Sequence, residues 1–209
     1  MKQRISTNAF KLIVGFETGG RAYYDKRLSH PTWPEGSSGV TIGFGYDLGY
    51  EKRLDRDWGH FFNPEQLTRL ARCLGKTGRV AQQAVSGVRD IEVPWDIAAE
   101  VFNENTLPQE IRKTLATYPT SAARLPADAF GALVSLIFNR GQDLSGDRRR
   151  EMKQIKILLA DMSVQNMDLC QKIAAQFRSM KRLWHDDKDS DGDLVDRREA
   201  EAQLIENAA

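Results

Sequence analysis

The chain has 209 residues, of which 41% are hydrophobic and 28% charged, and its formal net charge is +1 at pH 7. This composition is typical of a soluble globular protein, and the length suffices for one large domain or for a large lobe with a small one. The charge balance argues against a dedicated nucleic-acid-binding protein, which usually carries a basic excess or a basic face. No segment reaches the ~18 uninterrupted apolar residues of a membrane span, so membrane insertion is not expected. The first residues also lack the apolar core of a signal peptide.

The first predicted helix covers residues 8–17, has cap candidates in Ser6, Thr7 and Asn8, and ends at Gly19 and Gly20. One side of this helix is an apolar stripe at helical spacing that ends in a carboxylate, and it consists of Phe10, Ile13, Val14 and Glu17. Burying an ionised carboxylate without a partner is costly. We therefore expect Glu17 to have either a partner or a catalytic role.

A small β lobe is expected next, with a short strand at residues 21–25, a loop over residues 26–38 and a second strand at residues 40–46. Three glycines in or beside the second strand would weaken it unless a backbone or a ligand must approach closely.

From residue 51 onwards the pattern is helical. The predicted helices cover residues 51–58, 64–74, 78–88, 94–103, 108–117, 127–138, 149–161, 164–184 and 195–206. The helix at 127–138 is apolar almost all round, which is typical of the buried centre of a bundle. The sequence thus predicts an α+β fold in one domain over 1–209. It would consist of a small β lobe at about 21–49 and a helical lobe formed by about 50–209 together with the first helix. A cleft would lie between the two lobes.

Glu17, Thr41 and Asp47 form the first candidate site. Glycoside hydrolysis needs an acid that protonates the leaving oxygen and a second carboxylate that activates water or attacks. Glu17 has apolar neighbours, as a general acid requires, and Asp47 lies in a glycine-rich segment together with Thr41. The alternative is that Glu17 pairs with a core arginine and that Asp47 is a turn residue.

Other residues are candidates for binding substrate. Asn139 ends the helix at 127–138 and could hold a sugar amide, although Gly141 behind it also fits an ordinary helix end. Aromatic platforms for sugar rings are a further possibility, and the candidates are Tyr23, Tyr24, Trp33 and Phe44.

Charged segments close to the C-terminus allow two readings each. Arg198 lies on an inward stripe and needs a carboxylate, which Glu17 could supply, or it forms a purely structural ion pair. An aspartate-rich segment matches the first half of a calcium loop and contains Asp187, Asp189, Asp191 and Asp193. Position twelve of that loop is Arg198 where a glutamate is required, so a polar turn is the alternative. The basic run at residues 148–150 is either a solvated helix start or an anion-binding patch.

Neither the cysteines nor the histidines indicate a metal. Cys73 and Cys170 sit among apolar residues and are expected to be buried thiols, with one disulfide as the alternative. The three histidines lack the spacing of zinc ligands.

Four segments, in order along nearly the whole chain, resemble the phage-type lysozymes, the endolysin muramidases of glycoside hydrolase family 24. The pattern is most similar to the pesticin-like branch of bacteriocin and effector domains. The segments are residues 16–20 (FETGG), 40–49 (VTIGFGYDLG), 132–141 (ALVSLIFNRG) and 197–201 (RREAE).

The resemblance implies a lysozyme-like fold and cleavage of the β-1,4 bond between N-acetylmuramic acid and N-acetylglucosamine. Glu17 corresponds to the general acid, Thr41 to the residue that positions water, and Asp47 to the second carboxylate of the pesticin-like branch. In the phage branch the aspartate precedes the threonine, and Asp25 stands at about that place here, so Asp25 is the competing second carboxylate. An inverting mechanism would separate the two carboxyl groups by about 6.5–9.5 Å.

The same resemblance sets expectations for partners. The substrate would be bacterial peptidoglycan, reached in the periplasm after phage release, uptake or delivery by a secretion system. The protein is expected to be a monomer without a required cofactor, and an immunity protein is a possible partner. Two alternatives stay open, namely a chitin- or chitosan-cleaving relative and a non-catalytic cell-wall-binding module.

Overall fold

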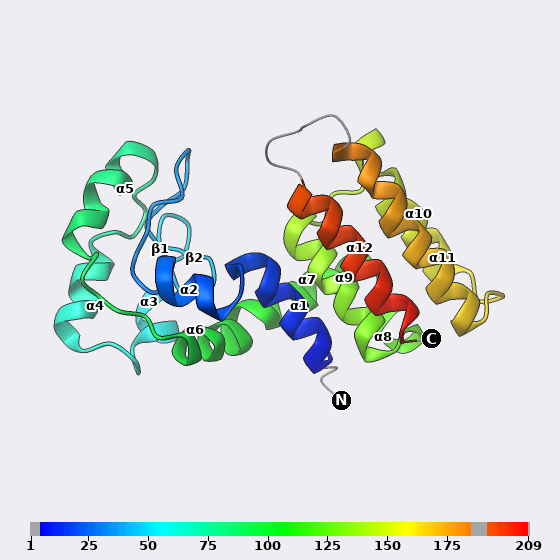
Figure 1. Ribbon diagram of the computed structural model, residues 1–209, viewed down its shortest axis with the longest axis horizontal. Coiled ribbons are helices and arrows are strands. Elements are labelled where there is room, and N and C mark those ends of the chain that lie inside the picture. Colours follow the sequence, from blue (N-terminus) through cyan, green and yellow to red (C-terminus); the bar gives the residue numbers. More distant parts are fainter. Residues whose placement is uncertain (1–4, 185–191, 209) are drawn as a thin grey trace. The chain divides into compact units, whose positions relative to one another are not determined.

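The computed structural model of the protein describes residues 5–184 and 192–208. These residues are mostly helical and include a two-stranded antiparallel sheet, which confirms the α+β class (Figure 1). The chain divides into two compact units, one formed by residues 1–16 with 109–209 and the other by residues 17–108. This boundary differs from the predicted one, because residues 50–108 group with the hairpin instead of the C-terminal helices.

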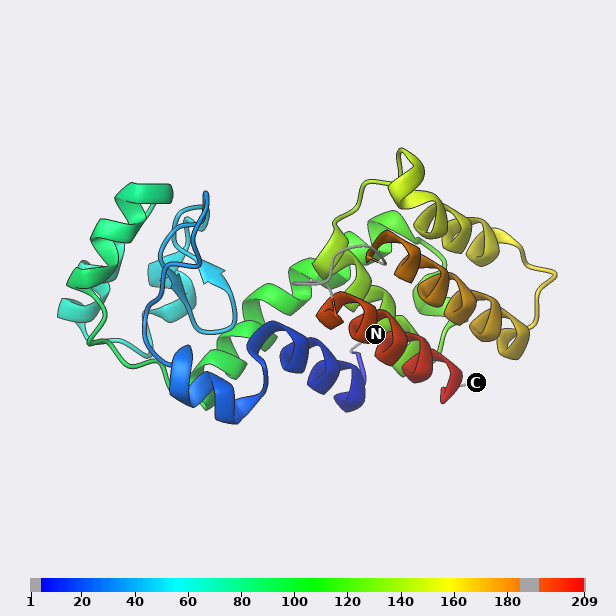
Figure 2. The same cartoon turned by 45° about the horizontal axis from the view of Figure 1, so that its top comes forward.

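The first unit is a helical bundle that includes most of helix α1. Its elements are α1 (Thr7–Thr18, as far as Phe16), α7 (Leu107–Thr117, from Gln109), α8 (Ser121–Arg124), α9 (Ala127–Arg140), η3 (Asp147–Arg149), α10 (Arg150–Ala160), α11 (Asn166–Ser179), η4 (Met180–Trp184) and α12 (Gly192–Glu206). Helix α12 packs against α9 and α11, and α10 packs against α11 (Figures 1 and 2).

Helix α9 is the centre of this unit, as the sequence predicts. All its residues from Ala129 to Ile137 are buried. Helix α1 approaches it closely at Gly131, where an added Cβ atom would lie 2.2 Å from the Cβ atom of Ala9. A side chain at this point would separate the two helices, so the contact depends on glycine.

A buried polar cluster joins α9 to α12. Glu201 accepts hydrogen bonds from Ser135 Oγ at 2.5 Å and from Arg198 Nη2 at 2.9 Å, while Arg197 Nη2 donates to Ser135 Oγ at 3.0 Å. All four side chains are buried. Because a buried charge is tolerated only with partners, this cluster fixes the register of α12 on α9.

Arg124 at the end of α8 secures the connection between α10 and α11. Its guanidinium donates to the carbonyl oxygens of Leu158, Leu159, Asp161 and Val164 at 2.7–3.2 Å. The last carbonyls of a helix have no partner within the helix, and a cation is also favourable there. One arginine therefore closes the C-terminal end of α10.

The second unit carries the sheet and shorter helices. Its elements are α2 (Arg21–Arg27), β1 (Thr41–Ile42), β2 (Tyr46–Asp47), α3 (Leu54–Trp58), α4 (Pro64–Ala71), α5 (Gly78–Ala84), η1 (Val85–Gly87), α6 (Trp95–Val101) and the π-helical turn η2 (Phe102–Thr106). Aromatic rings fill its interior. Trp58 stacks on Phe62 and meets Tyr46 edge-on.

Two predicted strands differ in the structure. The strand predicted at residues 21–25 is wrong, since these residues form helix α2. Tyr24 is its buried residue, and Arg21 lies 3.7 Å from Asp25 one turn later, an arrangement that only a helix provides. The strand predicted at residues 40–46 is instead a hairpin, because the positive φ angles of Gly43 and Gly45 reverse the chain in its middle.

The prediction for the two cysteines is confirmed. Cys73 and Cys170 are buried free thiols, and burial raises the pKa of each. The basic run at residues 148–150 does lie at the start of a helix. Among the described residues, no helix combines the length and apolar character that crossing a membrane requires.

We predict opposite effects of alanine at two helical glycines. Gly131→Ala should lower the free energy of unfolding by about 1–3 kcal/mol, since its methyl group would overlap Ala9. Gly15→Ala, where an added Cβ meets nothing within 4 Å, should raise it by about 0.5–1 kcal/mol through helix propensity. Urea denaturation followed by circular dichroism measures both. Equal effects of the two substitutions would contradict the close contact of α1 and α9.

Candidate active site

Glu17 is the last residue but one of helix α1 and belongs to the second unit. Its side chain is half-buried. The helix stops directly after it, because Gly19 and Gly20 take positive φ angles of 67° and 85°. Thr18 Oγ1 accepts the N–H of Gly20 at 3.2 Å and fixes this turn. The local sequence thus places a carboxylate at a defined helix end.

Thr41 and Asp47 face each other across the hairpin. They are direct partners in the register of β1 and β2. Both backbone groups of Thr41 bond to Thr32, at 2.8 and 3.0 Å, so they point away from β2. The pair is therefore of the non-hydrogen-bonded kind, in which the Cα atoms are only about 4.5 Å apart and the side chains lie close together. This geometry brings the hydroxyl and the carboxylate to the same face of the hairpin.

The Asp47 carboxylate is held by backbone N–H groups on both sides. Gly39 donates to Oδ1 and Oδ2 at 3.0 and 3.1 Å, and Gly49 donates to Oδ1 at 2.7 Å. An ionised carboxylate offers about four acceptor positions. One position on Oδ2 is therefore left for a water molecule or a substrate hydroxyl.

Gly39 is required by this arrangement. A Cβ atom added there would lie 2.3 Å from Asp47 Oδ1 and 2.3 Å from the backbone nitrogen of Gly49. No side chain fits between these atoms, so the residue before the strand must be glycine for the carboxylate to keep its position.

An aromatic cluster anchors the tip of the hairpin. The ring of Phe44 lies edge-on to Tyr24, with centroids 5.2 Å apart, and 4.7 Å from the ring of Trp95. Tyr24 donates its hydroxyl hydrogen to the carbonyl of Val93 at 2.8 Å, and burial raises its pKa. Its side chain is fully buried, whereas a sugar platform needs an open ring face. We therefore place Tyr24 in the core and leave it out of the proposed site.

Trp33 and Asp25 keep some exposed surface. Trp33 is half-buried and donates its Nε1–H to the carbonyl of Ser38 at 3.1 Å, so its ring is held in the loop before β1. It stays a candidate platform. Asp25 lies on α2, where its exposed carboxylate faces Arg21. It thus comes from a helix, while Asp47 comes from the hairpin.

Asn139 and Arg198 belong to the first unit. Asn139 is exposed in the last turn of α9. Arg198 is fully buried, and its Nε lies 2.7 Å from Glu201 Oε2. Burial lowers the pKa of Arg198 and raises that of Glu201, while the opposite charge of each works against the shift of the other. The structural ion pair, one of the two sequence alternatives, is the one that the described contacts support.

The calcium prediction falls mostly outside the described residues. Asp187, Asp189 and Asp191 are not among them, and Asp193 is an exposed residue in the first turn of α12. Within residues 5–184 and 192–208, no three carboxylate, histidine or cysteine side chains are grouped so as to hold a metal ion.

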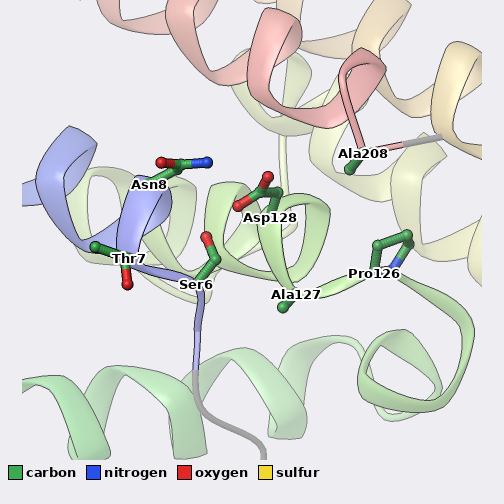
Figure 3. Close-up of a pocket in the computed structure, with 7 residues that line it drawn as sticks. All are labelled: Ser6, Thr7, Asn8, Pro126, Ala127, Asp128 and Ala208. Carbon is green, nitrogen blue, oxygen red and sulfur yellow. The ribbon is translucent and has the colours of Figure 1, made fainter.

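One open pocket lies within the first unit, at the beginnings of α1 and α9 (Figure 3). Its volume is about 430 Å³, and it is lined by Ser6, Thr7, Asn8, Pro126, Ala127, Asp128 and Ala208. Ser6 Oγ accepts the N–H of Ala9 at 3.0 Å, so this lining includes a helix cap. None of the predicted site residues lines this pocket.

Sequence reasoning found the hydroxyl and the carboxylates but missed the groups that hold them. The amides of Gly39 and Gly49 are the donors to Asp47. The Asp-x-Gly spacing of residues 47–49 is the available signal, because an aspartate commonly accepts the N–H two residues further on. No local sequence pattern predicts the hydrogen bond from Gly39 to Asp47, since it forms only when the hairpin brings the two residues together.

Comparison of the sequence with models of protein families gives no match, and comparison with curated proteins gives none either.

We predict that Asp47 contributes to stability. Asp47→Ala should lower the free energy of unfolding by about 1–3 kcal/mol, because the N–H groups of Gly39 and Gly49 lose their acceptor. Asp25→Ala, at an exposed position, should change it by less than about 0.5 kcal/mol. Thermal or urea unfolding tests this, and equal stability of the Asp47→Ala variant and the wild type would show that the bonds to Gly39 and Gly49 are not needed.

Proposed function

We propose that the protein is a peptidoglycan muramidase with a lysozyme-like fold. The observation that carries the proposal is the side-by-side position of Thr41 and Asp47 on a hairpin, in the same unit as the helix-end carboxylate of Glu17. A half-buried glutamate, an aspartate with a remaining acceptor position and a neighbouring hydroxyl are the groups that glycoside hydrolysis needs.

In the proposed mechanism, Glu17 protonates the glycosidic oxygen as the bond to the leaving sugar breaks. The free acceptor position on Asp47 Oδ2 takes a proton from a water molecule as the oxygen of that water forms the new bond to the anomeric carbon, and Thr41 Oγ1 holds the water by a hydrogen bond. The fixed carboxylate favours this role, because a general base has to be aligned with the water before reaction. Asp25 is the competing base, and it would act from helix α2.

A non-catalytic cell-wall-binding module is the second candidate function. The hydrogen bonds that Asp47 accepts from Gly39 and Gly49 suffice to explain an aspartate at this position by stability alone. This candidate predicts binding to sacculi without new reducing ends. The muramidase proposal predicts binding together with new reducing ends.

We predict that Glu17→Gln abolishes glycan cleavage while the protein stays folded. The amide cannot donate the proton to the leaving oxygen, so release of soluble muropeptides from purified sacculi should fall by about 10²–10⁴-fold. Glu65→Gln is the matched control, since Glu65 is exposed on α4 of the same unit. Equal activity of the Glu17→Gln variant and the wild type would contradict the assigned acid.

The stereochemistry of the product tests the second carboxylate. If Asp47 activates water, cleavage of the β-1,4 bond should give the α-anomer first, which nuclear magnetic resonance can follow before mutarotation. Asp47→Asn should lose this activity and Asp25→Asn should keep it. An initial β-anomer would instead require a covalent intermediate and would contradict the proposed mechanism.

A further inference from the structure

Three arginines come together where α9 ends and η3 begins, and we call Arg140, Arg148 and Arg149 the arginine cluster. Arg140 Nη2 donates to the carbonyl of Arg148 at 2.6 Å. The guanidinium of Arg140 lies over the ring of Trp184, 5.1 Å from its centroid. This stacking fixes the guanidinium in one place, and its buried Nε has no hydrogen-bond partner.

Within the described part of the chain, no carboxylate forms an ion pair with the arginine cluster. The nearest acidic residues in sequence are engaged elsewhere: Asp147 pairs with Arg150 and Arg182, and Glu151 pairs with the same two arginines. Arg149 Nη1 instead contacts the sulfur of Met152 at 3.9 Å. Among residues 5–184 and 192–208 the cluster therefore has no ion-pair partner, and Asp143 and Glu151 act on Arg149 and Arg140 only through their charges at longer range.

The charges of the cluster act on one another. Burial, followed by the positive charges of Arg149, Arg198 and Arg148, lowers the pKa of Arg140 to about 10, against the smaller opposite effect of Glu151. Like charges at this proximity repel each other, so an anion would relieve an unfavourable interaction already present.

Helix stability explains only part of the cluster. Arg140 ends α9, where a cation interacts favourably with the helix dipole. Arg148 and Arg149 lie in the first turn of the segment formed by η3 and α10, where a cation is unfavourable. Asp147 beside them supplies the negative charge that suits this end. The two arginines need another explanation.

We propose that the arginine cluster is an anion subsite that binds a carboxylate of the peptide stems attached to the glycan. The assignment of this carboxylate to a peptide stem rests on the proposed function. Guanidinium groups match carboxylates through two parallel N–H···O bonds, and the remaining N–H groups of Arg140, Arg148 and Arg149 are available for such a pair. The overall net charge of +1 does not favour a polyphosphate such as nucleic acid.

Binding can be measured without turnover, from the fluorescence of Trp184. The wild-type protein is titrated with a soluble stem tripeptide that has free carboxylates, with its fully amidated counterpart, and with inorganic phosphate. We expect saturable quenching with the free carboxylates alone. Arg149→Gln should weaken this binding about tenfold or more, because one charged donor is lost. The Trp184→Phe variant should lose this quenching, which shows that the signal comes from Trp184.

Arg150→Gln is the matched control, because Arg150 is adjacent in sequence but already paired with Asp147 and Glu151. It should bind the tripeptide as the wild type does. The subsite is refuted if Arg149→Gln binds unchanged or if the amidated peptide binds equally well, and equal affinity for phosphate contradicts a carboxylate-selective site. Intact tripeptide binding without any cleavage of sacculi contradicts the muramidase proposal alone and supports the subsite.

Discussion

The carboxylate of Asp47 is the group on which the proposed site depends. It accepts N–H bonds from Gly39, before the hairpin, and from Gly49, after it. These bonds close a loop around β1 and β2, whose strands are two residues long and would not hold together through their own ladder. The same bonds fix the carboxylate beside Thr41. The same set of contacts therefore stabilises the hairpin and would align the proposed catalytic base.

The first unit relies on a different constraint, the burial of charge between α9 and α12. Arg197, Arg198 and Glu201 are enclosed together with Ser135. Removing one member of such a cluster leaves an unpaired buried charge and usually costs about 3–5 kcal/mol. The guanidinium of Arg197 also lies over the ring of Phe16, 5.6 Å from its centroid. This contact ties α1 to the cluster at Phe16, within the first unit.

Local pattern is enough to predict most of the helices, with α2 as the exception, and to select candidate site residues, but it does not predict how they pair. The buried helix α9 followed from its apolar residues, and Glu17 followed from its place on an apolar stripe. The strand predicted around Tyr24 is wrong because aromatic residues favour strands in general, whereas Tyr24 here is the buried residue of helix α2 and packs against Phe44. The sequence leaves Glu17 and a structural ion pair open for Arg198, and the contact that decides for the latter is with Glu201, three residues further along the same helix. Contacts between side chains and between elements decide these two cases. The periodicity of a single element carries no information about them.

The central claim is cleavage of the bond between N-acetylmuramic acid and N-acetylglucosamine. The most direct test is to digest purified sacculi with the wild-type protein, reduce the new ends with borohydride and identify the terminal sugar by mass spectrometry. The account predicts reduced N-acetylmuramic acid at every new end. Reduced N-acetylglucosamine, or no new ends on sacculi that the protein demonstrably binds, would contradict it.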